Sequence, residues 1–172
     1  MKIYTVGGYN EVGKNMTVVE SNSEAVIFDI GLFMEKIVDV EEDEQARFDS
    51  DDLIKIGAIP DDNYVKNLNV KAIVIGHAHL DHIGALPYLA SKYKCPIIGT
   101  PYTIEILKAI IKDKGLKLKN DIKILNINSH LKISNNLKIE FVNITHSVPQ
   151  TVITALHTNE GIAMYANDFK LD

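Results

Sequence analysis

Three histidines and an aspartate occur within six residues of this chain, as His77, His79, Asp81 and His82, one glycine after the apolar run 72–75. Imidazole and carboxylate groups are the ligands that zinc and similar divalent ions prefer in proteins. In an extended segment the side chains of His77 and His79 point to the same side, so both can bind one ion. Asp81 and His82 follow a bend and can face a second ion. The motif therefore predicts a site for two divalent metal ions at the end of a strand.

Three more candidate site residues stand where apolar, strand-like runs end, namely Asp29, His146 and Asp168. His146 is a further candidate ligand, and the carboxylate of Asp168 could bridge two ions, which an imidazole cannot do. Asp29 could support a ligand histidine from behind. Each of the three could instead be an ordinary turn or structural residue. The motif upstream favours ligation for His146 and Asp168.

The distribution of apolar residues predicts a mixed fold. Short β-rich runs predict strands at 2–6, 16–20, 25–29, 71–75, 122–126, 137–144, 151–157 and 162–166. Between them, helices are predicted at 85–93 and from the Thr100-Pro101 cap to about Gly115, with Ile104, Leu107 and Ile111 as the buried stripe of the second. Strands early and late, with helices between them, favour an α/β or α+β fold. The 172 residues have the length of one domain.

Several features predict a cytoplasmic protein without a membrane partner. No apolar run approaches the roughly 20 residues that cross a bilayer. The N-terminus reads as a strand followed by a glycine turn, unlike a signal peptide. The lone cysteine, Cys95, cannot form an internal disulfide, and its place before an apolar run predicts a small buried side chain rather than a reactive thiol.

The charges are mostly acidic. The net charge is −5 and Arg47 is the one arginine, which argues against a broad phosphate-binding surface. Acidic residues are concentrated between Glu35 and Asp62. This acidic segment is either a solvated loop or helix face, or an insertion that serves as a lid or binds a partner. The sequence does not separate the two.

The metal motif resembles the signature of the metallo-β-lactamase superfamily, and His146, Asp168 and Asp29 match its later histidine, later aspartate and early aspartate. Three further stretches, at 7–16, 146–149 and 167–170, resemble ribonuclease J, particularly its archaeal members. The resemblance implies the superfamily fold, an αββα sandwich of two sheets with helices outside. It extends over nearly the whole chain.

Two parts of that family pattern have no counterpart here. The superfamily's second half supplies a last metal-binding histidine, and ribonuclease J carries an inserted beta-CASP domain after its Asp-Phe-Lys segment. Residues 1–172 therefore read as the N-terminal portion of the metallo-β-lactamase domain, with doubtful activity on their own. The expected partners are the missing half and the beta-CASP domain, or a second copy, with a homo-oligomer for the full-length protein.

The resemblance implies a metal-dependent hydrolase of RNA phosphodiester bonds, acting as a 5′-to-3′ exoribonuclease and in a second mode as an endoribonuclease. His77, His79 and His146 would hold one ion, zinc or alternatively manganese. Asp81 and His82 would hold the other, and Asp168 would bridge. Ser147 could donate a hydrogen bond to a phosphate oxygen. A small-molecule hydrolase of the same superfamily and a non-catalytic metal-binding scaffold are the alternatives.

Overall fold

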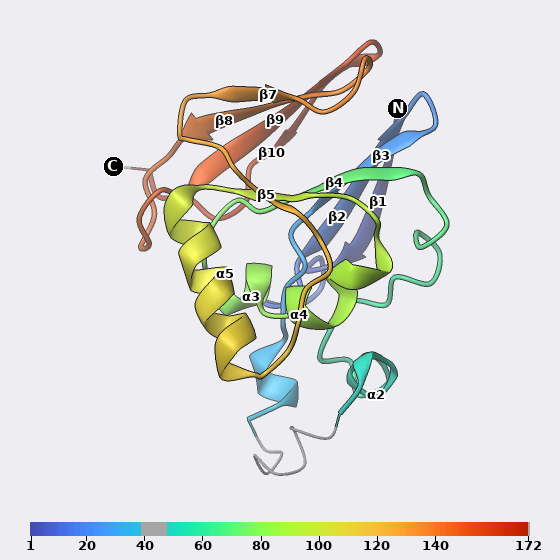
Figure 1. Ribbon diagram of the computed structural model, residues 1–172, viewed down its shortest axis with the longest axis vertical. Helices are drawn as coiled ribbons and strands as arrows, with labels where there is room; N and C mark the ends of the chain where they lie inside the picture. Colours follow the sequence, from blue (N-terminus) through green and yellow to red (C-terminus); the bar gives the residue numbers. More distant parts are fainter. Residues whose placement is uncertain (39–47, 172) are drawn as a thin grey trace.

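The computed structural model describes residues 1–38 and 48–171 and consists of two β-sheets with helices on one side (Figure 1). The larger sheet has the order β1-β2-β3-β4-β5-β6 and the smaller one the order β10-β9-β8-β7. The strands of the larger sheet are β1 (Lys2–Gly7), β2 (Met16–Ser21), β3 (Glu24–Phe28), β4 (Val70–Val74), β5 (Ile97–Gly99) and β6 (Ile122–Ile124). Those of the smaller sheet are β7 (His130–Lys132), β8 (Lys138–Asn143), β9 (Val152–Thr158) and β10 (Gly161–Tyr165).

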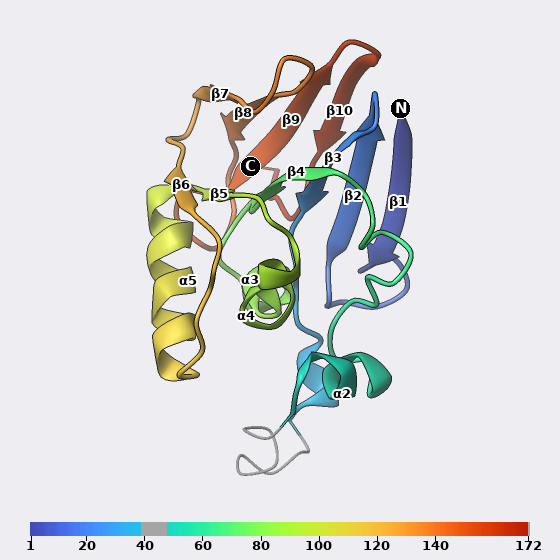
Figure 2. The same ribbon diagram turned by 45° about the vertical axis from the view of Figure 1, so that its right-hand side comes forward.

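The helical segments are η1 (Met34–Lys36), α2 (Ser50–Lys55), α3 (Leu80–Ile83), α4 (Leu86–Leu89), η2 (Ala90–Lys92) and α5 (Pro101–Asp113). In Figure 2, α3, α4 and α5 lie against one face of the larger sheet, and α2 lies beyond the ends of β1 and β2. Among the described residues, no helix covers the outer face of the smaller sheet. These layers, helices followed by two sheets, confirm the predicted mixed fold and correspond to three of the four layers of the expected αββα sandwich. No described helix is long and apolar enough to cross a membrane.

The central strands of the larger sheet are buried on both faces. In β3, Ala25 and Ile27 pack toward the helices, whereas Val26 and Phe28 pack toward the smaller sheet. The two sets belong to separate cores because neighbouring side chains on a strand point to opposite faces. Continuous apolar runs are typical of parallel strands covered on both sides, and β3 and β4 do pair in parallel.

The structure differs from the prediction mainly in short elements. β5 and β7 have three residues each and were not predicted, and β6 is shorter than the predicted strand. The predicted helix 85–93 divides into α4 and η2, and the chain becomes extended at Tyr93, whose hydroxyl donates to Asp62 Oδ2 over 2.7 Å. α5 begins after the Thr100 cap, as predicted. It buries Ile104 and Leu107, also as predicted, whereas Ile111 is only partly buried.

The structure also shows the surroundings of Cys95 and of part of the acidic segment. Cys95 is buried, as predicted, and burial raises the pKa of its thiol to about 11. The acidic segment is partly helical, because Asp49 caps α2 by accepting hydrogen bonds from the backbone of Asp51 and Asp52. Asp62, at the end of the segment, is not solvated, because it is buried against Tyr93. Residues 39–47 of this segment lie outside the described residues.

Candidate metal centre

The ends of four strands bring the candidate residues to one edge of the molecule. β3 and β4 run in parallel, so the chain leaves both strands at the same edge, toward Asp29 after β3 and His77 after β4. The smaller sheet is joined to this edge by a hydrogen bond from Val152 N to Gly76 O of 3.0 Å. The loop before β9 carries His146, and the chain after β10 carries Asp168. Residues far apart in the sequence therefore meet where the two sheets adjoin.

Four of the candidate residues form a first group. His79 Nδ1 lies 3.1 Å from His77 Nε2 and 3.2 Å from His146 Nε2. Together with a carboxylate oxygen of Asp168, these ligand atoms lie within 4.8 Å of one another. Three imidazole nitrogens and one carboxylate oxygen are a donor set that suits a zinc-like ion.

A second group consists of Asp81, His82 and Asp168. His82 Nε2 lies 3.3 Å from Asp81 Oδ2 and 3.7 Å from Asp168 Oδ2. The same Asp168 oxygen lies 4.0 Å from His77 Nε2 and 3.8 Å from His146 Nε2 of the first group. Asp168 thus stands between the two groups, where a bridging carboxylate is expected.

Burial and charge set the protonation of the two central histidines differently. Burial of His77, followed by the neighbouring histidines, lowers its pKa to about 2, which keeps this imidazole neutral and able to bind a cation. Burial opposes charge on His82 as well, but the carboxylates of Asp29 and Asp81 raise its pKa to about 10. The His82 imidazole thus has carboxylates on both ring nitrogens.

Asp29 supports the second group from behind. Its side chain is fully buried, with Oδ2 2.7 Å from His82 Nδ1 and Oδ1 accepting a hydrogen bond of 3.0 Å from Gly76 N. The backbone at Asp29 has φ +59°, a left-handed conformation that aspartate adopts more readily than most residues. One carboxylate therefore fixes both the His82 ring and the backbone just before His77.

Two asparagines that the sequence left without a role also touch the cluster. Asn15 Nδ2 donates to the carbonyl oxygen of Asp81 over 2.9 Å and lies 3.1 Å from His82 Nε2. Asn167 Nδ2 lies 3.3 Å from His77 Nδ1. Both asparagines belong to stretches that carried the resemblance to ribonuclease J, and that was the signal available. Ser147, the candidate donor to a phosphate oxygen, has its Oγ 3.3 Å from His79 Nε2.

Gly31 permits the close approach of the N-terminal segments to the metal motif. A Cβ atom at this position would lie 1.6 Å from Asp81 O and 2.7 Å from Asn15 N. We expect Gly31→Ala to destabilise the protein by about 3 kcal/mol, because the backbone around Asp81 must move. Urea unfolding measures this, with Gly99→Ala as the control, since a Cβ there meets only side-chain atoms at 3.1 Å or more. Equal stability of the two variants would contradict the packing described.

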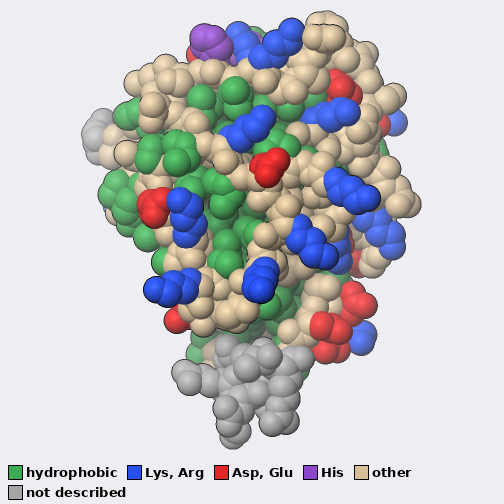
Figure 3. Space-filling model, in the orientation of Figure 1, with side chains coloured by type: hydrophobic (Ala, Val, Ile, Leu, Met, Phe, Trp, Pro, Cys, Tyr) green, Lys and Arg blue, Asp and Glu red, His purple; other side chains and the backbone are tan. Residues whose placement is uncertain are grey.

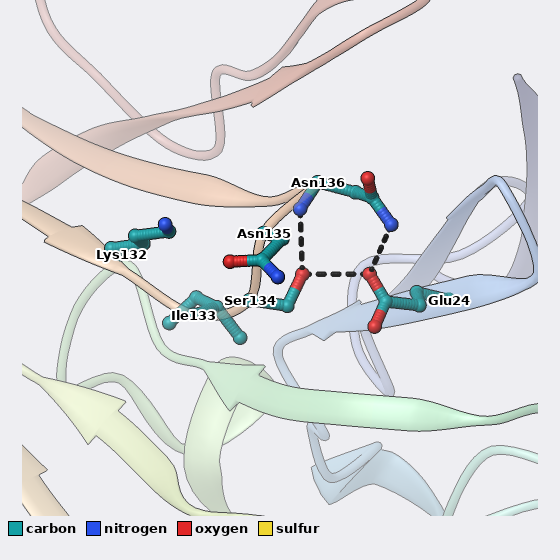
Figure 4. A pocket seen from close by; sticks show the side chains of 6 residues that line it. All are labelled: Glu24, Lys132, Ile133, Ser134, Asn135 and Asn136. Carbon is teal, nitrogen blue, oxygen red and sulfur yellow. Dashed lines mark hydrogen bonds between the residues drawn. The ribbon is translucent and has the colours of Figure 1, made fainter.

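A surface depression lies at the other end of β3, away from the candidate ligands (Figure 4). Ser134 Oγ donates to Glu24 Oε2 over 2.6 Å, and Asn136 Nδ2 donates to the same oxygen over 3.2 Å. These bonds join the turn between β7 and β8 to the larger sheet. They also lower the pKa of Glu24, with the Ser134 hydrogen bond as the largest cause. The depression is therefore a junction between the sheets, separate from the candidate metal ligands.

The fold and the His and Asp cluster together define a two-sheet protein suited to binding divalent metal ions. The family model of the metallo-beta-lactamase superfamily matches residues 9–166. The chain therefore belongs to the metallo-β-lactamase superfamily. A solved protein of unknown function from Enterococcus faecalis V583 shares the fold, with a TM-score of 0.72, 19% identity, and coverage of 98% of this chain and 43% of that one. For the metallo-beta-lactamase fold protein YhfI from Bacillus subtilis, the TM-score is 0.58 at 18% identity, covering 96% and 61%.

Within this superfamily, the chain is similar in sequence to ribonuclease J from several organisms. Ribonuclease J from Pyrococcus abyssi is 49% identical over 174 residues, which cover 100% of this chain and 39% of the relative. Ribonuclease J from Methanocaldococcus jannaschii is 44% identical with the same coverage, and ribonuclease J 1 from Streptococcus pyogenes is 34% identical over 99% of this chain and 28% of its own length. The chain thus spans about two fifths of the length of the two most similar of these.

Proposed function

We propose that this chain forms the metal-binding part of a hydrolase that cleaves RNA phosphodiester bonds as a 5′-to-3′ exoribonuclease of the ribonuclease J type. The observation that carries the proposal is the position of Asp168 Oδ2, within 4.0 Å of histidine nitrogens from both ligand groups. Two adjacent ion sites occur in phosphatases, polymerases and nucleases, and also in aminopeptidases. The likeness to ribonuclease J over the whole chain supports RNA as the substrate.

Each residue has a proposed role in this site. His77, His79 and His146 hold one divalent ion, Asp81 and His82 hold the second, and Asp168 contacts both. When bound, such ions polarise the phosphate and make water a nucleophile near neutral pH. We propose zinc, with manganese as the alternative, because the ligands are imidazoles and carboxylates.

The residues around the ligands are proposed to position them. Asp29 orients His82 through Nδ1, and Asn15 holds the backbone of Asp81. Ser147 is exposed beside His79, where its hydroxyl can donate to a phosphate oxygen of the substrate. These contacts keep the ligand atoms in place before substrate arrives, which is how preorganised sites stabilise developing charge.

We further propose that residues 1–172 are the N-terminal portion of the catalytic domain and that additional protein packs beside β10. This strand is an edge of its sheet, and its Ile162 and Met164 side chains are 60% and 63% exposed. An edge strand with exposed apolar side chains favours association with further chain or with a second copy. As the family resemblance implies, we also propose that the full-length protein carries a beta-CASP domain and forms a homo-oligomer.

The two ligand groups are expected to bind metal with different affinities. The first offers three histidines and Asp168, whereas the second offers His82 and two carboxylates among the described residues. We predict two binding steps, the first at least about tenfold tighter than the second. Calorimetric titration of the metal-free chain with zinc, and separately with manganese, measures both steps. His82→Ala should weaken chiefly the second step, and an equal loss in both would contradict the assignment.

A chimera tests the proposed reaction. The matching 39% of Pyrococcus abyssi ribonuclease J is replaced by this chain, so that the relative supplies the rest of its own length. With 5′-monophosphorylated RNA labelled at its 3′ end, we expect metal-dependent shortening from the 5′ end that Asp81→Ala abolishes. A folded, metal-loaded chimera that leaves RNA intact would contradict the proposal. Cleavage of a lactam or thioester instead would favour the small-molecule hydrolase.

A further inference from the structure

The net charge of −5 conceals a strong separation of charge along the chain. Residues 92–138 contain ten lysines and three acidic residues, Glu105, Asp113 and Asp121, which gives this segment a charge of +7. The remaining residues therefore carry −12. Figure 3 shows lysine side chains spread over the face that the segment from α5 to β7 crosses in Figure 1.

Several of these lysines surround α4 and η2. The ammonium group of Lys114 lies 5.8 Å from the centre of the Tyr88 ring on α4. The backbone N–H of Lys119 donates to Ser91 Oγ over 3.2 Å, and Lys94 and Lys119 line the same surface depression. The segment after α5 thus wraps around the residues before β5 and brings lysines from both together.

The local structure directs these lysines toward solvent. In the stretch 116–119, Leu116 and Leu118 are half-buried while Lys117 and Lys119 are exposed, the alternation expected of an extended chain. Asn120 Nδ2 fixes this stretch by donating to three backbone carbonyl oxygens, those of Ala90, Tyr93 and Cys95. The segment is therefore held against the protein by its apolar and amide side chains, and its cations remain outside.

Most of the segment's lysines have no acidic partner. Lys92 and Lys108 form ion pairs with Asp62 and Glu105. No carboxylate of the described residues lies within 4.0 Å of the following six exposed lysines, which we call the lysine track: Lys94, Lys112, Lys114, Lys117, Lys119 and Lys123. Unpaired cations grouped on one surface create a positive potential that attracts polyanions.

We propose that the lysine track binds the sugar-phosphate backbone of single-stranded RNA, independently of sequence and outside the metal centre. The choice of RNA as the polyanion rests on the proposed function, whereas the charge and its placement do not. Lysine contacts to phosphates release counterions, so binding of this kind weakens steeply with salt. Such a surface would hold RNA near the protein while one end is processed.

The test measures binding of a fluorescein-labelled oligouridylate by anisotropy over a range of salt concentrations. EDTA is present, so neither the metal centre nor hydrolysis contributes. The track variant is K94Q/K119Q/K123Q, and the control variant K2Q/K55Q/K66Q changes the net charge equally on exposed lysines elsewhere. Each lost phosphate contact lowers the slope of log affinity against log salt by about 0.7 for a single strand. We expect the track variant to lose about 2 in slope and about tenfold or more in affinity at low salt, with little change in the control.

Three results would overturn the proposal. These are equal losses in the two variants, no binding of the RNA by the parent chain at low salt, and binding of phosphatidylserine vesicles without binding of RNA. Melting temperatures of both variants identify any loss caused by unfolding, and single K119Q and K94Q variants then replace the triple. If the lysine track does not bind RNA but the chimera cleaves it, the proposed reaction is still supported. Conversely, RNA binding in EDTA by a chain whose chimera is inactive would support the lysine track alone.

Discussion

Replacing Asp168 by alanine is expected to lower metal binding at both ligand groups, a larger effect than that of any other single substitution in the centre. Its Oδ2 atom lies 3.7 Å from His82 Nε2, 3.8 Å from His146 Nε2 and 4.0 Å from His77 Nε2. One oxygen therefore lies close to histidines of both groups. Partners that merely support a ligand change metal affinity by about 10–100-fold, so loss of a shared ligand should exceed about 100-fold at each site.

Competition with a chromophoric chelator measures the two affinities in the Asp168→Ala variant. Asp168→Asn is the informative comparison, because it keeps the size of the side chain and removes its charge. Asp121→Ala removes an exposed carboxylate outside both ligand groups and should leave binding unchanged. If Asp168→Ala binds two ions as tightly as the parent chain, Asp168 does not bridge.

The second large effect is expected at Asp29, whose loss should destabilise the metal-free protein by about 3–5 kcal/mol. Its carboxylate is 0% exposed and pairs with His82, which is 2% exposed. Removing one partner leaves the other charge buried and unpaired, which is the costly way to break such a pair. Alanine would also have to adopt φ +59°, and that conformation adds about 1 kcal/mol or more.

Urea unfolding of metal-free Asp29→Ala and Asp29→Asn measures this effect. Asparagine tolerates the left-handed conformation and can still accept the hydrogen bond from Gly76 N, so its variant should lose less stability than alanine. Metal binding by the second ligand group should fall in both variants, because the His82 ring loses its support. A loss below about 1 kcal/mol for Asp29→Ala would show that the buried pair does not stabilise the fold.

The sequence was informative about this centre where the ligands are close together or follow recognisable strands. The motif from His77 to His82 needs only one strand end and the first turn of α3 to bring its members together. Asp29, His146 and Asp168 follow β3, β8 and β10, and the structure brings all three to the cluster. Their roles as ligands and support remain predictions.

Contacts made through neutral side chains were not predictable. Asn15 reaches Asp81 across 66 residues, and Asn167 reaches His77 across 90 residues. Neither asparagine differs locally from a turn residue, so only the resemblance to a family drew attention to their stretches. Nothing near Asp62 in the sequence indicates that it is buried either, because its partner Tyr93 is 31 residues away. Net charge was a poor guide as well, because the total of −5 averages a basic segment at 92–138 with the acidic remainder of the chain.

Anomalous X-ray diffraction from crystals of the zinc-loaded or manganese-loaded chain can locate two divalent ions that share Asp168. We expect two anomalous peaks about 3.5–4 Å apart, one beside His77, His79 and His146 and the other beside Asp81 and His82. An Asp168 oxygen should lie within bonding distance of both peaks. A single peak, or two peaks of which Asp168 contacts at most one, would show that Asp168 does not bridge two ions.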